Sequence, residues 1–158
     1  RSTLFPYTTL FRSMPLVGYA CYKAKHIFVD KSGPKAIKET IDNARQTLQG
    51  GTSLVVFPEG SRSFTGHMGK FRKGAFQLAD ELQLPVVPIT IDGSFDVLTR
   101  MAGLNFVNRH PMRLVIHKPI FPTSNSPEDI KQTMEKAYSD IMSALPAKYQ
   151  GYKENPDQ

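Results

Sequence analysis

The chain has 158 residues, of which 40% are hydrophobic and 22% charged, and its formal net charge is +6. This length and composition suit one domain with a sizeable core and exclude an intrinsically disordered chain. The single cysteine, Cys21, excludes an intrachain disulfide scaffold, and no run of about 18 apolar residues predicts a membrane-spanning helix. The positive charge favours an anionic partner, which nucleic acid, acidic lipid headgroups or a phosphorylated substrate would all satisfy.

The first thirteen residues, Arg1 to Ser13, show neither helical nor strand periodicity and lack the pattern of a signal peptide. They resemble the translation of a sequencing adapter. We therefore expect residues 1–13 to be a non-native lead, residues 14–150 to form one domain, and residues 151–158 to be a polar tail.

The next segment predicts a short strand followed by a helix. Ile27 to Val29 is the strand, and Ser32 and Pro34 are typical of a helix N-cap and first turn. Gly50 and Gly51 end the helix. Its apolar face repeats at steps of three and four residues, at Ile37, Ile41, Ala44 and Leu48.

A second strand–helix unit follows. Leu54 to Phe57 is a continuous apolar run, typical of a strand covered on both faces. A polar, glycine-rich loop is predicted from Pro58 to Lys73, and then a helix that Pro85 ends. That helix turns Ala75, Leu78, Ala79 and Leu82 inward.

Two more strands and a long helix complete the pattern. Val86 to Ile91 and Leu114 to Ile116 are predicted strands, and Phe95 to His110 fits no element clearly. Ser126 with Pro127, Glu128 and Asp129 predicts a capped helix start. The buried stripe of this helix is expected at Ile130, Met134, Ala137, Ile141 and Leu145.

Alternating strands and helices predict an α/β fold with a mostly parallel central sheet and helices packed on it, incomplete at the N-terminus. In such sheets the functional loops lie beyond the carboxyl ends of the strands. The loop after Phe57 is the longest of these, and it contains Arg62, Lys70, Arg72 and Lys73. Cations and glycines at a strand-to-helix junction suit a phosphate group. The alternative is a solvated turn in which Glu59 pairs with Arg62.

Residues Phe57 to Ser63 resemble the Phe-Pro-Glu-Gly-Thr-Arg-Ser block of the glycerolipid acyltransferase family, with Ser61 in place of threonine. Ile27 to Lys31 is similar to another block of that family, with lysine in place of its arginine. Three further stretches are also similar to the family: Pro15 to Tyr19, Lys73 to Phe76, and Leu84 to Ile89.

The resemblance implies transfer of an acyl group from coenzyme A or acyl carrier protein to a hydroxyl of lysophosphatidate or a related glycerophospholipid, with no metal or further cofactor. It implies work at the cytoplasmic face of the cell membrane, on an anionic surface, as a peripheral protein or one anchored through N-terminal sequence outside this chain. The substrate-binding residues it implies are Glu59, Gly60, Ser61, Arg62 and Lys31. The supporting residues it implies are Phe57, Pro58, Lys73, Gly74 and Pro88.

The family's catalytic His-x-x-x-x-Asp pair does not occur in this sequence. None of His26, His67, His110 and His117 is followed by aspartate five residues later. We therefore expect a truncated, inactive copy of the enzyme. The alternative is a non-catalytic lipid-binding or membrane-binding relative. A nucleic-acid binder would fit the charge, but no helix-turn-helix, zinc-finger or RNA-binding signature supports one.

Overall fold

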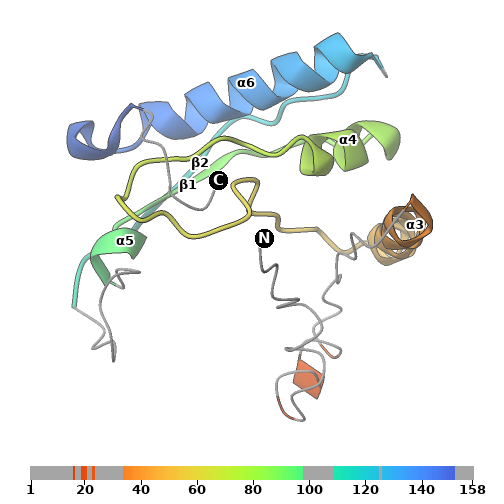
Figure 1. The fold of residues 1–158 in the computed structure, drawn as a ribbon, viewed down its shortest axis with the longest axis horizontal. Helices are drawn as coiled ribbons and strands as arrows, with labels where there is room; N and C mark the ends of the chain where they lie inside the picture. The colour runs from red at the N-terminus through yellow and green to blue at the C-terminus, as the bar shows by residue number, and fades with distance from the viewer. Residues whose placement is uncertain are drawn as a thin grey trace, which may run out of the picture. The chain divides into compact units, whose positions relative to one another are not determined.

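A computed structural model describes residues 16, 19–20, 23, 34–97, 109–124 and 126–151, which form two compact units divided between Val55 and Val56 (Figure 1). The predicted strand Ile27–Val29 lies outside the described residues, as do residues 1–13 and Lys31. In the first unit, α3 spans Pro34–Gln49 and confirms the helix predicted there. Ala44 on its apolar face is fully buried. Gly51 has φ 78° and donates its N–H to the Leu48 carbonyl at 3.0 Å, which ends the helix.

The prediction of a buried strand over Leu54–Phe57 is wrong. The segment has no strand assignment, and its four side chains are exposed, Val55 to 75% and Phe57 to 70%. An apolar, β-favouring composition makes a segment suitable for a strand, but the strand forms only where a neighbour accepts its backbone hydrogen bonds. Among the described residues no strand pairs with this one.

The second unit contains a two-stranded sheet of β1 (Ile89–Asp92) and β2 (Arg113–Ile116). The strands are antiparallel, so the described residues do not confirm a mostly parallel sheet. The antiparallel register places Asp92 opposite Arg113, and the two side chains pair at 3.5 Å. Helix α5 (Ser94–Val97) follows β1.

Prolines limit this sheet at one end, so that β1 begins at Ile89 and not at the predicted Val86. Pro88 and Pro119 have no N–H to donate, so the ladder stops at Ile89 and Ile116. Beyond them the His117 N–H donates to the Pro88 carbonyl, and an isolated bridge joins Val86 to Ile120 through two backbone hydrogen bonds of 2.9 and 2.8 Å.

Helix α6 (Pro127–Ser143) packs against both α4 (Gly74–Glu81) and β1, and Figure 1 shows it, in blue, running along them. The predicted N-cap is confirmed, since Ser126 Oγ accepts the Asp129 N–H at 3.2 Å. Phe76, Ala137 and Thr90 are buried where these elements meet. A short 3-10 helix, η1 (Ala147–Tyr149), follows α6. Within the described part of the chain, no helix has the length and apolar character needed to cross a bilayer.

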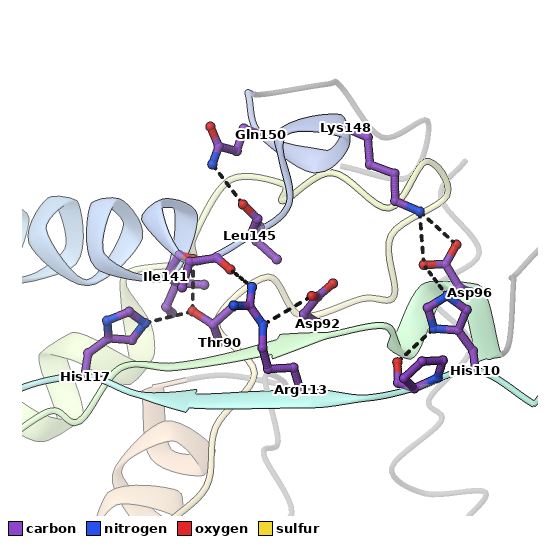
Figure 2. A network of polar contacts seen from close by, with 12 residues as sticks. Thr90, Asp92, Asp96, His110, Arg113, His117, Ile141, Leu145, Lys148 and Gln150 are labelled. Atoms are coloured by element: carbon purple, nitrogen blue, oxygen red, sulfur yellow. Dashed lines mark hydrogen bonds and ion pairs between the residues drawn. The ribbon is translucent and has the colours of Figure 1, made fainter.

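Polar contacts fasten the sheet to the end of α6 (Figure 2). Thr90 is fully buried, and its hydroxyl lies 2.9 Å from the Ile141 carbonyl and 2.8 Å from His117 Nε2. The single hydroxyl proton goes to the carbonyl, so His117 must donate from Nε2. Arg113 lies 3.5 Å from Asp92 and also donates to the Ala144 carbonyl.

Candidate functional site

The loop Pro58–Lys73 connects the apolar segment Leu54–Phe57 to α4, as predicted, and its own backbone closes it at the base. Gly60 N–H donates to the Phe57 carbonyl at 3.1 Å, and Arg72 N–H donates to the Pro58 carbonyl at 2.8 Å. The second bond brings the two ends of the loop together. Residues early and late in the loop therefore share one small region.

Glu59 joins the early and late residues of the loop through a hydrogen bond. Its Oε2 atom accepts the Gly69 N–H at 2.8 Å, across ten positions of sequence. Burial raises the pKa of Glu59 above its ordinary value, and the Gly69 hydrogen bond opposes part of that shift. A partly buried carboxyl with a raised pKa in a basic loop is a common feature of functional sites.

Gly60 lies directly against the side chain of Arg72. Its φ of 74° is one that side-chain-bearing residues rarely adopt, and a Cβ built there would come within 2.9 Å of Arg72 Nε. Glycine is therefore needed at this position both for the backbone conformation and for the approach of the guanidinium.

Ser61 is the least satisfied residue of the loop. Its hydroxyl oxygen is buried and has no hydrogen-bond partner among the described residues. The nearby Ser63 contrasts with it, because Ser63 Oγ accepts the Gly66 N–H at 2.9 Å and donates to the His67 carbonyl at 2.8 Å. Buried hydroxyls are nearly always bonded, so the Ser61 hydroxyl lacks a partner that such a group ordinarily has.

The loop contains four cations. Arg62, Lys70, Arg72 and Lys73 all have exposed side chains. Lys73 is the N-cap residue of α4 and makes no side-chain cap, so the first N–H groups of α4, from Gly74 onward, add positive potential at the same end of the loop.

Phe71 anchors the far end of the loop to the helices. Its ring is 6.1 Å from that of Phe76 in α4 and 5.0 Å from that of Tyr138 in α6. Lys70 and Phe71 together form one wall of an open groove, and α6 forms the other wall with Met134, Glu135 and Tyr138.

The structure brings most of the predicted site residues together. Glu59, Gly60, Ser61 and Arg62 are consecutive, and the closed base of the loop brings Lys73 and Gly74 to the same end as half-buried Pro58. Phe57 is exposed beside them. Pro88 is buried before β1, away from the loop in sequence, and its carbonyl accepts the His117 N–H at 3.0 Å. Their roles in binding remain predictions.

The sequence alone did not indicate the specific contacts of three residues. Arg72 was recognised only as one of several cations, and its contact with Gly60 gives it a specific place. Gly69, the donor to Glu59, resembles any loop glycine in the sequence. Tyr149 contacts Gly66 from the C-terminal end, and no pattern within the loop points to it.

Comparison with known proteins matches residues 3–92 to a family described as acyltransferase. The chain is 33% identical over 109 residues to a chloroplastic 1-acyl-sn-glycerol-3-phosphate acyltransferase of Brassica napus, covering 68% of this chain and 31% of that protein. It is 40% identical over 77 residues to a 1-acyl-sn-glycerol-3-phosphate acyltransferase of Pseudomonas aeruginosa, covering 48% of this chain and 30% of that one.

The crystal structure of a 1-acyl-sn-glycerophosphate acyltransferase from Thermotoga maritima matches with a TM-score of 0.67 at 25% identity, covering 91% of this chain and 56% of that one. The chain thus spans about a third of the length of the curated relatives described above and somewhat more than half of the solved structure.

Proposed function

This chain belongs to the acyltransferase family, and from that membership we propose that its loop Pro58–Lys73 binds the phosphorylated acceptor of an acyl transfer. The acceptor is lysophosphatidate or a related glycerophospholipid. The donor is an acyl thioester carried by coenzyme A or acyl carrier protein.

The observation that carries this proposal is the buried hydroxyl of Ser61, which has no hydrogen-bond partner among the described residues. Leaving a buried polar group unsatisfied costs about 1–3 kcal/mol, so a ligand oxygen bonded to it would recover that free energy. The cations nearby, Arg62 and Arg72 among them, identify a phosphate oxygen as the most suitable partner.

Different side chains of the loop would contact different groups of the acceptor. Arg72 lies beside Gly60, where a guanidinium can hold a phosphate through two parallel N–H bonds. Glu59 accepts the Gly69 N–H, and its carboxyl would accept a further hydrogen bond from a glycerol hydroxyl. Because burial raises the pKa of Glu59, a nearby dianionic phosphate would raise it further. The hydroxyl contact, rather than charge, is therefore the expected role of Glu59.

In the transfer itself, the acceptor hydroxyl oxygen forms a bond to the acyl carbon, the carbon–sulfur bond breaks, and the hydroxyl proton ends on the thiol. A general base must take that proton. No histidine of the sequence has an aspartate five positions later. We therefore propose that this chain by itself binds the acceptor without transferring an acyl group.

The groove beside the loop favours a lysophospholipid over free glycerol phosphate. Its walls include Phe71, Met134 and Tyr138, with Lys70 at one side. Apolar surface next to a cation suits a molecule with a hydrocarbon chain attached to a phosphate. A lysophospholipid should therefore bind more tightly than glycerol 3-phosphate.

The same cations support a position at an anionic membrane surface on its cytoplasmic face. The net charge is +6, and Lys70, Arg72 and Lys73 are exposed in one stretch. Each cation near an anionic surface contributes about 1 kcal/mol of attraction, which salt weakens.

Isothermal titration calorimetry of the full chain with short-chain lysophosphatidate tests the proposal. We expect saturable binding, weaker binding of glycerol 3-phosphate, and none of a monoacylglycerol with the same acyl chain. Equal binding of the monoacylglycerol would refute a phosphate site. Addition of acyl-coenzyme A to the complex should release no free thiol, and steady thiol release would refute the proposed lack of turnover.

Single substitutions locate the site. Ser61→Ala and Arg72→Met should each weaken lysophosphatidate binding by about tenfold or more, because a charge-assisted hydrogen bond contributes about 1.5–3 kcal/mol. Lys136→Met is the matched control, since Lys136 is an exposed cation of α6 that pairs with Asp140 at 3.3 Å, outside the groove. An equal loss in the control would show that net charge, and not the loop, controls binding.

A further inference from the structure

We propose that Tyr149, in the short helix η1, is a positioning residue for the loop Pro58–Lys73: its ring fixes the segment Ser63–His67 and, through it, the Gly69 N–H that holds Glu59. This role rests on the acceptor-binding function proposed above. Tyr149 lies far from the loop in sequence and outside every stretch that resembles the acyltransferase family.

The contact between Tyr149 and Gly66 is the first step. Gly66 has φ 82°, and a Cβ built on it would lie 2.4 Å from Tyr149 Cε1 and 3.1 Å from Phe95 Cδ1. The two rings therefore pack directly on the backbone of the loop at a residue that has no side chain. Only glycine leaves room for this approach.

The ring of Tyr149 is held from several sides. It meets His67 edge to face at 6.1 Å and Phe95 at 5.9 Å, and Lys148 Nζ lies 4.4 Å from its centre. His67 is itself buried, with its side chain 3.3 Å from the Thr65 carbonyl. Aromatic pairs in such arrangements add stability beyond the area they bury.

The hydroxyl of Tyr149 is tied to α5, where it donates to Asp96 Oδ1 at 2.7 Å. Lys148 and His110 also converge on Asp96, at 3.4 and 3.9 Å (Figure 2). This cluster holds η1 against α5, so the ring that presses on Gly66 has a fixed support.

A short, buried stretch connects Gly66 to the hydrogen bond that holds Glu59. Ser63 Oγ binds both the Gly66 N–H and the His67 carbonyl, which makes Ser63–His67 a rigid turn. Residues His67, Met68 and Gly69 are all buried, and the Gly69 N–H reaches Glu59 at 2.8 Å. A shift of the turn would therefore move the donor that orients the carboxyl.

The test compares Tyr149→Ala, Tyr149→Phe and Phe121→Ala by amide hydrogen exchange and by calorimetry with short-chain lysophosphatidate. Phe121 is 67% exposed, so its truncation is a control of equal size outside the loop. For Tyr149→Ala we expect faster exchange at Gly69 and weaker binding, each by about tenfold, which is the scale of lost aromatic packing. The Thr90 amide, in the sheet, should keep its protection. Tyr149→Phe keeps the ring and should stay within about threefold of wild type in both measurements.

Unchanged Gly69 exchange and binding in Tyr149→Ala would overturn the proposal. So would equal loss of protection at Gly69 and Thr90, because Tyr149 would then support the whole unit. A Tyr149→Phe protein as impaired as Tyr149→Ala would assign the effect to the hydroxyl and overturn the role of the ring. If wild type fails to bind the lipid, the proposed function falls, whereas Gly69 exchange still decides whether Tyr149 fixes the loop.

Discussion

Replacement of Gly60 by alanine separates the backbone requirement of the loop from its requirement for space. The φ of Gly60 is 74°, and the new methyl group would lie 2.9 Å from Arg72 Nε and 3.2 Å from Arg72 Cζ. Gly51 provides the matched control. Its φ is 78°, and an added Cβ would meet no atom of the described residues within 4 Å.

The expected magnitudes follow from these two environments. An L-residue in the left-handed region costs about 1–2 kcal/mol, so both variants should lose about that much free energy of unfolding. The clash adds little to the stability loss in Gly60→Ala, because the exposed Arg72 side chain can move away. Its movement removes the guanidinium from the proposed phosphate position, so lysophosphatidate binding should weaken by about 10- to 100-fold. Gly51→Ala should bind as wild type does.

Urea denaturation followed by circular dichroism gives the stability of each variant, and calorimetry gives its affinity. Two results would refute the reasoning. If Gly60→Ala binds lysophosphatidate with wild-type affinity, the place of Arg72 beside Gly60 does not matter for binding. If Gly51→Ala loses as much affinity, the loss reflects general destabilisation and not the position of the guanidinium.

Three further predictions concern stability. Thr90→Val removes a buried hydroxyl that joins His117 to the Ile141 carbonyl, so we expect a loss of about 1–3 kcal/mol in urea denaturation; a neutral effect would show that water replaces the hydroxyl. Ser126→Ala removes the cap of α6 and should cost about 1 kcal/mol, while Ser139→Ala on the exposed face should cost less than about 0.5 kcal/mol; equal effects would contradict the capping argument. Because burial raises the pKa of Glu59 above 4.5, the folded chain holds that proton more tightly than the unfolded chain does. Ionised Glu59 therefore destabilises the fold fully above the raised pKa, and this destabilisation disappears as the pH falls towards 4.5. The thermal midpoint of wild type should consequently rise relative to that of Glu59→Gln over the same pH window. A constant difference between the two midpoints would contradict it.

The helices were predictable because their signals are local. Ser126 is a side-chain cap that acts within one turn, and Gly51 ends α3 through a bond to a residue three positions earlier. The strands were less predictable because strand pairing is set by partners elsewhere in the chain. Leu54–Phe57 has the composition of a strand and no described partner, and β1 pairs in the antiparallel sense with β2, which is distant from it in sequence.

The same distinction applies to the site. The sequence indicated Glu59, Gly60, Ser61 and Arg62 because they form one contiguous block. It did not indicate what holds them, since Tyr149 reaches Gly66 from a distant part of the chain. A contact of that kind leaves no periodicity or spacing that a reader of the sequence could use.

The hydrogen bonds that shape the loop nevertheless join residues that lie within the loop or next to it. They are the Phe57–Gly60, Pro58–Arg72 and Glu59–Gly69 bonds. The geometry that would receive a phosphate therefore depends little on the sheet. We propose that this chain supplies no general base for acyl transfer, because no histidine here has an aspartate at the required spacing. On these proposals, acceptor binding and acyl transfer are separable, and this chain allows the first to be measured without the second.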